Sequence, residues 1–165
     1  MQKFLVCLLI LFSFSVSAGK TTILFGDDSC NALRTKLERE IPLSLNSSAS
    51  CGKTLPRVKS NLVIFVLDST NGLMPESRNQ LAQLKARGGG ANMAIVLTNT
   101  YFVDDAELLA LVHMELIEYM NQLDLPTDKI PTFLDYEKSQ YDSNDPTMPI
   151  RKGISQIVGF VKRQK

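Results

Sequence analysis

The sequence predicts a three-layer α/β domain with a mainly parallel sheet. Two uninterrupted apolar runs, 62–67 and 93–97, have the length and composition of buried strands. Each run ends in a polar turn, and each turn leads into a segment with the pattern of a helix. Short buried strands that alternate with helices are typical of a parallel sheet covered by helices.

Four strands are expected, at about residues 21–26, 61–67, 93–97 and 130–134. The fourth contains Pro131, which cannot donate a backbone hydrogen bond to a neighbouring strand. We therefore expect the fourth strand to lie near an edge of the sheet.

Helices are expected between and after these strands. The first covers about 30–41, with Asp27, Asp28 or Ser29 as its cap and Pro42 as its end. The second starts at about Pro75 and ends before three glycines, 88–90, and the third runs from 105 to about 123. A final helix is predicted from the helical spacing of apolar residues Ile150, Ile154, Ile157, Val158 and Val161.

The first 18 residues have the pattern of a secretory signal peptide. Lys3 supplies a basic start, residues 4–16 are apolar apart from serines, and Val16-Ser17-Ala18 fits a signal-peptidase site. The apolar run is shorter than the roughly 20 residues that a membrane-spanning helix needs. We expect cleavage before Gly19 and a secreted or periplasmic protein without a membrane anchor; the alternative is that this segment forms a buried first strand.

Size and charge agree with one domain, 19–165. The whole chain has 165 residues and a formal net charge of +1, which gives no argument for a nucleic-acid partner. Cys7 would leave with the signal peptide, so that Cys30 and Cys51 remain. A pair of cysteines in an oxidising compartment predicts a disulfide, and two unpaired buried thiols are the alternative.

The carboxyl ends of the two apolar runs predict the position of a binding site. In open parallel sheets, ligands bind outside these strand ends. Asp68 ends the first run, and Thr98, Asn99, Thr100 and Tyr101 follow the second. Asp68, Thr98, Thr100 and Tyr101 are therefore expected to border any small-molecule site.

Three segments in the same order resemble the GTP-binding domain of elongation factor Tu, a translational GTPase. Residues 68–78 are similar to the D-G-P-M-P-Q-T-R-type turn and helix that follow an apolar strand in that family. Residues 103–115 are similar to the family's V-D-D-x-E-L-L-x-L-V-x-M-E stretch, and 124–131 to its D-F-P-G-D-x-x-P stretch. The resemblance covers about residues 60–133 and implies a P-loop GTPase-like fold.

A working member of that family would bind GTP and magnesium through a phosphate loop of the pattern G-x-x-x-x-G-K-[ST]. Gly19, Lys20, Thr21 and Thr22 reproduce the second half of this pattern, but Phe14 stands at its first glycine. Gly52-Lys53-Thr54 is a second partial copy, with Ser47 at the first glycine. The favoured interpretation of both copies is chance.

The other nucleotide motifs of the family are incomplete here. Residues 98–101 align with the guanine-reading N-K-x-D motif and place Tyr101 where the aspartate should accept two hydrogen bonds. A shift by one residue aligns Asn99 with the motif's asparagine but puts Phe102 in place of the aspartate. Losing both bonds would cost roughly 3–6 kcal/mol. Between 44 and 60 nothing supplies the family's D-C-P-G-H segment.

Two functions are thus carried forward. The favoured one is an exported pseudo-GTPase without catalytic residues, cofactor or metal, which binds a protein partner in the cell envelope. The alternative is a GTP hydrolase that uses Gly19, Lys20, Thr21, Thr22 and Asn99 to bind GTP with magnesium. A weaker third possibility is that a nucleotide, recognised with altered specificity, or another anion binds beside Asp68 and Asn99.

Other candidate residues have simpler interpretations. His113 lies beside the apolar stripe of the third helix, without a nearby cysteine or a pair of glutamates, and is expected at the surface or its boundary. Asp27-Asp28 could hold a metal after a strand, but helix capping is favoured.

Overall fold

The computed structural model describes residues 22–40, 51, 62–88, 92–142 and 149–164, which form one five-stranded sheet in the order β1-β2-β3-β4-β5. All four pairings between neighbouring strands are parallel. The elements in chain order are β1 (Thr22–Gly26), α1 (Cys30–Glu40), β2 (Leu62–Asp68), α2 (Pro75–Ala86), β3 (Met93–Thr98), η1 (Thr100–Phe102), α3 (Ala106–Gln122), η2 (Thr127–Lys129), β4 (Thr132–Leu134), β5 (Ile150–Lys152) and α4 (Ile154–Arg163).

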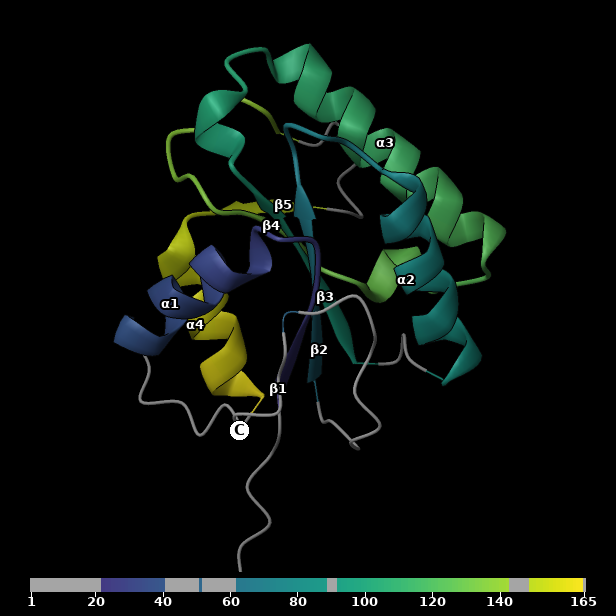
Figure 1. Ribbon diagram of the computed structural model, residues 1–165. Helices are drawn as coiled ribbons and strands as arrows, with labels where there is room; N and C mark the ends of the chain where they lie inside the picture. The colour runs from purple at the N-terminus through teal and green to yellow at the C-terminus, as the bar shows by residue number, and fades with distance from the viewer. Residues whose placement is uncertain (1–21, 41–50, 52–61, 89–91, 143–148, 165) are drawn as a thin grey trace, which may run out of the picture.

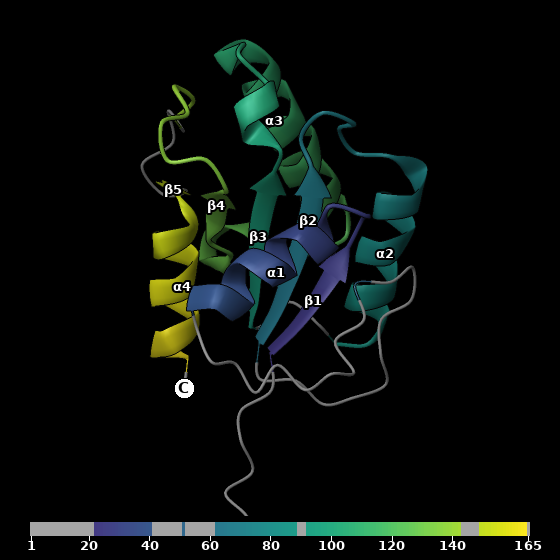
Figure 2. The same ribbon diagram turned by 60° about the vertical axis from the view of Figure 1, so that its left-hand side comes forward.

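Helices cover both faces of the sheet, so the predicted three-layer α/β fold is confirmed. Figure 1 shows α1 and α4 on one side of the sheet and α2 and α3 on the other. Figure 2 shows the same arrangement with the strands running side by side and their arrowheads at one end. That end, where the carboxyl termini of the strands meet, is where the candidate site lies.

Two apolar cores fill the spaces between the layers. Along β2, side chains alternate between the faces: Phe65 packs in the core under α2 and α3, and Ile64 packs in the core under α1 and α4. All seven residues of β2 are buried. A strand covered on both faces needs a continuous apolar sequence rather than an alternating one, which explains the run 62–67.

The first crossover connection differs in hand from the next two. Each of the connections through α1, α2 and α3 steps one strand in the same direction along the sheet. However, α1 packs on the opposite face from α2 and α3, so its connection must have the opposite hand. Figures 1 and 2 show α2 and α3 in right-handed connections, the usual hand for parallel strands, which makes the β1–α1–β2 connection left-handed.

β4 lies next to the edge of the sheet, as expected, because only β5 pairs with it on the side away from β3. The C-terminal elements correct one expectation. β5 was missed, and Ile150 begins this strand instead of the last helix, which starts at Ile154. β5 has only one apolar residue, Ile150, and its other two residues are Arg151 and Lys152. Charged side chains on an edge strand disfavour pairing with a strand of another chain.

A disulfide joins Cys30 to Cys51, as predicted, with Cα atoms 5.5 Å apart. It ties the first residue of α1 to the long segment that leads back to β2. Closing a loop of this length stabilises a fold by about 3 kcal/mol in the chain-entropy model.

The predicted signal peptide, 1–18, lies outside the described residues. Among the residues described, the helices are all too short or too polar to cross a membrane.

Gly26, the last residue of β1, is required by a close approach of two backbones. Its φ is +156°, and a Cβ at this position would overlap the carbonyl oxygen of Val66 and lie 2.8 Å from its carbonyl carbon. Gly159, in α4, has ordinary space around it, because the nearest atom to an added Cβ would be 3.5 Å away, on the flexible side chain of Arg163.

We expect Gly26→Ala to lower the free energy of unfolding by at least about 3 kcal/mol, because the backbone of β2 cannot yield without breaking the strand pairing. Gly159→Ala is the matched control and should raise it by about 0.5–1 kcal/mol, since alanine is the better helix former. Urea denaturation of both variants measures the two effects. Equal stability of the two variants would contradict the close approach.

Candidate functional site

Four polar segments meet at the carboxyl ends of the first four strands, and we call this surface the rim. Asp27 follows β1, Asp68 ends β2, Thr98 ends β3 and Asp135 follows β4. The strand register places Asp68 opposite Thr98, and Leu97 opposite Leu134. The rim therefore brings three carboxylates together from separate parts of the chain.

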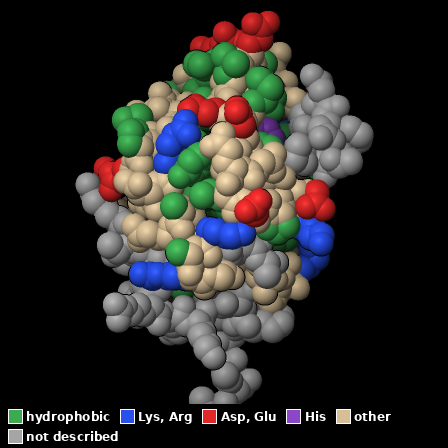
Figure 3. Space-filling model, turned by 90° about the vertical axis from the view of Figure 1, so that its right-hand side faces the viewer, with side chains coloured by type: hydrophobic (Ala, Val, Ile, Leu, Met, Phe, Trp, Pro, Cys, Tyr) green, Lys and Arg blue, Asp and Glu red, His purple; other side chains and the backbone are tan. Residues whose placement is uncertain are grey.

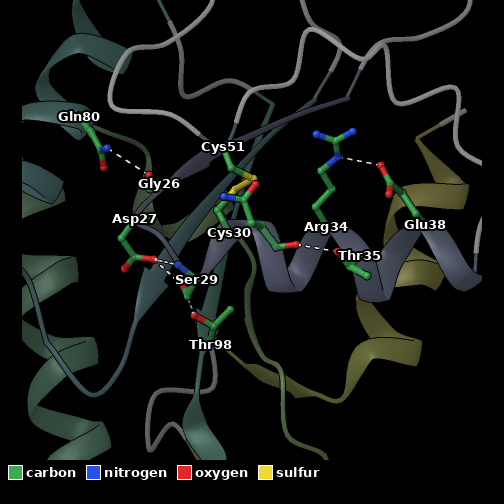
Figure 4. The surroundings of a disulfide bond; sticks show 11 residues. Gly26, Asp27, Ser29, Cys30, Arg34, Thr35, Glu38, Cys51, Gln80 and Thr98 are labelled. Carbon is green, nitrogen blue, oxygen red and sulfur yellow. Dashed lines mark hydrogen bonds and ion pairs between the residues drawn. A yellow bond between two sulfur atoms is a disulfide. The ribbon is translucent and has the colours of Figure 1, made fainter.

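The carboxylate of Asp27 joins β1 to β2 and to the start of α1. One oxygen accepts hydrogen bonds from the backbone N–H and the hydroxyl of Ser29, and the other accepts from the backbone N–H of Asp68. The Ser29 hydroxyl also bonds the hydroxyl of Thr98 (Figure 4). Burial raises the pKa of Asp27, and the hydrogen bonds from Ser29 and Asp68 oppose that rise.

Asp68 holds the turns that follow β2 and β3. Its Oδ1 accepts from the backbone N–H and the hydroxyl of Thr70, at 2.9 and 2.6 Å. Its Oδ2 accepts from the side-chain amide of Asn99, at 2.7 Å. Asn99 has the left-handed conformation, φ 57° and ψ 21°, which asparagine tolerates better than most residues.

Asp135 holds the start of η1 and was missed by the sequence reasoning. Its two oxygens accept from the backbone N–H groups of Asn99 and Thr100, both at 3.2 Å, and one also accepts from the Thr100 hydroxyl at 2.7 Å. Lys36 of α1 forms an ion pair with it at 3.4 Å. Its position directly after a predicted strand was the signal that could have found it.

The structure places the predicted site residues in different environments. Asp68, Thr98 and Thr100 are buried in the rim, and Asn99 lies among them. Tyr101 is 60 % exposed and makes edge contacts with the rings of Phe102 and Tyr136. The rim carboxylates thus bind backbone and side-chain donors of the protein itself.

The residues of the partial phosphate-loop pattern lie at the other end of the sheet or outside the described residues. Thr22 is the first residue of β1, so it lies at the amino end of the strands; Gly19, Lys20 and Thr21 fall outside the described residues. The turn that does connect β1 to α1 is Asp27-Asp28-Ser29, which carries two carboxylates. Phosphate loops need backbone N–H groups and a lysine at that place.

An open cleft of about 590 Å³ lies beside this turn, between β1 and the start of α2. It is lined by Gly26, Asp27, Asp28, Cys51, Asn71, Met74, Pro75, Glu76, Ser77 and Gln80. The side-chain amide of Gln80 points from α2 toward the turn and donates to the carbonyl oxygen of Gly26 at 3.2 Å (Figure 4). Sequence reasoning missed Gln80, although it shares the buried face of α2 with Leu81 and Leu84.

A second cavity, of about 440 Å³, lies at the opposite end of the sheet. Its lining includes the first residues of β2, β3 and β4 together with Arg151 and Phe160. The guanidinium of Arg151 lies 5.6 Å above the ring of Phe133 and makes a cation–π contact with it.

One acid of each acidic pair in the sequence, Asp27 and Asp105, makes hydrogen bonds in local structure. Asp27 accepts from the N–H of Ser29, just before α1, and Asp105 caps α3 by accepting from the N–H of Glu107 at 2.8 Å. In the part of the chain that the structure describes, His, Cys, Asp and Glu side chains form no group of three that could hold a metal ion.

His113 is buried, which corrects the expected surface position. It is 3 % exposed, and its Nδ1 lies 2.8 Å from the hydroxyl of Tyr141. Tyr141 comes from a loop far along the chain, so the helical pattern alone could not place it over His113. Burial lowers the pKa of His113 to about 4.

We expect the free energy of unfolding to fall by about 2 kcal/mol between about pH 7.5 and about pH 5, because the unfolded chain takes up a proton on His113 that the folded state does not. The loss begins below the unfolded pKa of about 6.5 and is complete below the folded value of about 4. Urea denaturation at the two pH values measures it. His113→Gln should remove this part of the pH dependence, and an unchanged dependence in the variant would assign it to other groups.

No model of a known protein family matches the chain. The resemblance to the elongation factor Tu domain therefore stays a prediction from sequence, whereas the all-parallel α/β fold and the disulfide are properties of the structure.

Proposed function

We propose that this protein is a non-catalytic binding module on a GTPase-like frame, exported to the cell envelope, which docks a basic protein segment on α3. The observation that carries this proposal is the outward face of α3. There, large apolar side chains and acidic side chains are exposed together, and the helix contains no lysine or arginine.

The apolar part of this face is a line of three side chains. Leu108, Leu111 and Met114 follow one another at a spacing of three residues, so that neighbours in the line lie close on the helix surface. Each is about half exposed, and Leu111 is 59 % exposed. Hydrophobic side chains that are exposed as a group commonly mark interaction sites. Figure 3 shows hydrophobic side chains on this side of the molecule, directly below acidic ones at its top.

The charges beside this line have one sign. Asp104, Asp105 and Glu107 stand at the start of α3, and Glu118 lies further along it; all four are exposed. Glu115 is paired with Arg78 of α2 at 2.5 Å, which leaves the other four carboxylates to set the local potential. A partner segment with apolar and basic side chains would bury the apolar line and pair with the acids.

The polar groups of the rim support a non-catalytic function over GTP hydrolysis. Asp68 and Asp135 are engaged with backbone and side-chain donors of the turns around them. The β1–α1 turn presents Asp27 and Asp28 where a phosphate group would need positive charge. Adding GTP there would bring together like charges in a partly buried place, which is unfavourable.

Export rests on two features of the chain. The residues 1–18 have the pattern of a signal peptide, and the Cys30–Cys51 disulfide is the kind of bond that persists in oxidising compartments. The residues with the phosphate-loop pattern, 19–22, would then form the new N-terminus.

We expect GTP with magnesium to leave the melting temperature unchanged. If a site existed, GTP at about 100 times its dissociation constant would stabilise the native state by about 2.7 kcal/mol and raise the melting temperature by about 5–10 °C. A thermal-shift assay with GTP, GDP and magnesium measures this, and the intact mass of the same sample identifies its N-terminal residue. A shift of that size in a protein that still begins at Met1 would favour the GTPase alternative.

We expect a synthetic amphipathic helix of leucine and lysine to bind the protein, and Leu111→Lys to abolish that binding by placing a charge in the middle of the apolar line. The change at an exposed position should alter stability by less than about 0.5 kcal/mol. Fluorescence anisotropy of the labelled peptide measures binding, which should weaken with added salt because the acids are exposed.

The matched control for this binding is Lys162→Glu, an exposed charge change on α4 in the opposite layer, which should leave the affinity unchanged. A leucine–glutamate peptide of the same length should not bind. Equal binding of the two peptides, or of the Leu111→Lys variant and the unchanged protein, would contradict docking on α3.

A further inference from the structure

We propose that the cleft between the β1–α1 turn and the start of α2 binds a guanidinium or amine group, carried by a small molecule or by an arginine or lysine side chain. The proposal uses none of the α3 residues and stands independently of docking there. It rests on the charge of the cleft and on one buried acceptor that has no hydrogen-bond partner.

The charge of the cleft favours a cation. Asp27, Asp28 and Glu76 line it, and the described residues of its lining include no lysine, arginine or histidine. Asp28 is exposed, and its carboxylate has no ion pair or hydrogen bond within the described residues. It is therefore the group in the cleft that is open to a ligand.

The start of α2 opposes these carboxylates only weakly. A helix N-terminus carries the equivalent of about half a positive charge. Met74, which precedes α2, gives it no side-chain cap, so this partial charge faces the cleft. The two carboxylates of the β1–α1 turn, Asp27 and Asp28, outweigh it. An anionic ligand would gain the helix terminus but meet both of these acids.

Gln80 supplies the second, independent observation. It is 2 % exposed, and its amide nitrogen donates to Gly26, as shown in Figure 4. This bond fixes the orientation of the amide, and the other end of the group, Oε1, has no hydrogen-bond partner. An unsatisfied buried acceptor costs about 1–3 kcal/mol, so a donor that enters the cleft and reaches it would gain that amount in addition to its contact with Asp28.

Several N–H donors on one cationic group match this arrangement better than a metal ion does. Asp27 already accepts three hydrogen bonds from Ser29 and Asp68, so it offers few further oxygen lone pairs. The described residues also hold no group of three metal-ligating side chains. A guanidinium has five N–H donors in one plane and can bond a carboxylate with two of them while others reach an amide oxygen.

The walls of the cleft are held in place by covalent and backbone constraints. Cys51 lines the cleft and is tied to Cys30 at the start of α1. Gly26 also lines it, and its backbone closely approaches that of Val66. The carboxylate of Asp28 is thus presented on a turn with little freedom, which reduces the entropy lost when a ligand binds.

The test is a titration of the whole protein with agmatine, an alkylguanidinium without a carboxylate, followed by ¹H–¹⁵N NMR. We expect saturable shifts of the backbone signals of Asp28 and Ser77 and of the side-chain amide signals of Gln80. Asp28→Asn should weaken binding about tenfold or more, because it removes a charge-assisted contact. Glu40→Gln, which changes an exposed acid at the far end of α1, is the control and should leave the affinity unchanged.

The same titration with a Gly-Arg-Gly peptide identifies the source of the ligand. Tighter binding of the peptide than of agmatine supports an arginine of a protein partner, and tighter binding of agmatine supports a small molecule. The proposal is overturned if neither gives saturable shifts at millimolar concentration, or if Asp28→Asn binds as well as the unchanged protein. It is also overturned if inorganic phosphate or magnesium alone shifts the same signals more strongly.

Discussion

The burial of β2 on both faces is the constraint on which the other elements depend. Its residues alternate between two cores, so neither helical layer can be lost without exposing one half of the strand. β1 and β3 pair on either side of it, and its carboxyl end carries Asp68 into the centre of the rim. At about 25 cal/mol for each Å² of apolar surface removed from water, a strand of this kind contributes more than any single polar contact around it.

At the rim, the carboxylates of Asp68 and Asp135 and the backbone N–H groups of the neighbouring turns satisfy one another's hydrogen bonds. In the turns after β2 and β3, the backbone N–H of Thr70 donates to the carboxylate of Asp68, and those of Asn99 and Thr100 donate to the carboxylate of Asp135. Because the acceptors are charged, each such bond is stronger than a neutral one. A ligand could bind these oxygens only by displacing the backbone donors that they already accept from. The carboxylate that is open to a ligand therefore lies in the cleft beside β1.

The sequence was sufficient for the elements whose patterns are local. β2, β3, α2 and α3 were predicted to within about two residues because their apolar spacing and their turns are continuous in the chain. β5 was not predictable in this way, because Ile150-Arg151-Lys152 becomes a strand only through pairing with β4. The same limit explains His113, whose burial comes from a contact with distant Tyr141.

The residues of the candidate site also differ in whether the local sequence pattern could place them. Asp68, Thr98 and Thr100 could be placed on the rim by following each apolar run to its end, and Asp135 obeys the same rule. Gln80 needed the structure, since a glutamine in a helix gives no sign that one end of its amide will bond Gly26 and the other will remain without a donor.

α1 and α4 cover the same face of the sheet, which affects how the chain folds during its synthesis. The two helices contact each other over the face of the sheet that holds Ile64 and Val66, yet they come from opposite ends of the described chain. The ribosome synthesises a chain from its N-terminus, so that α1 is complete long before α4. Until the last helix is synthesised, the apolar face of α1 can therefore pack on the sheet but not against α4. A chain that stops before Ile154 would leave that half of the core open to water and to other chains.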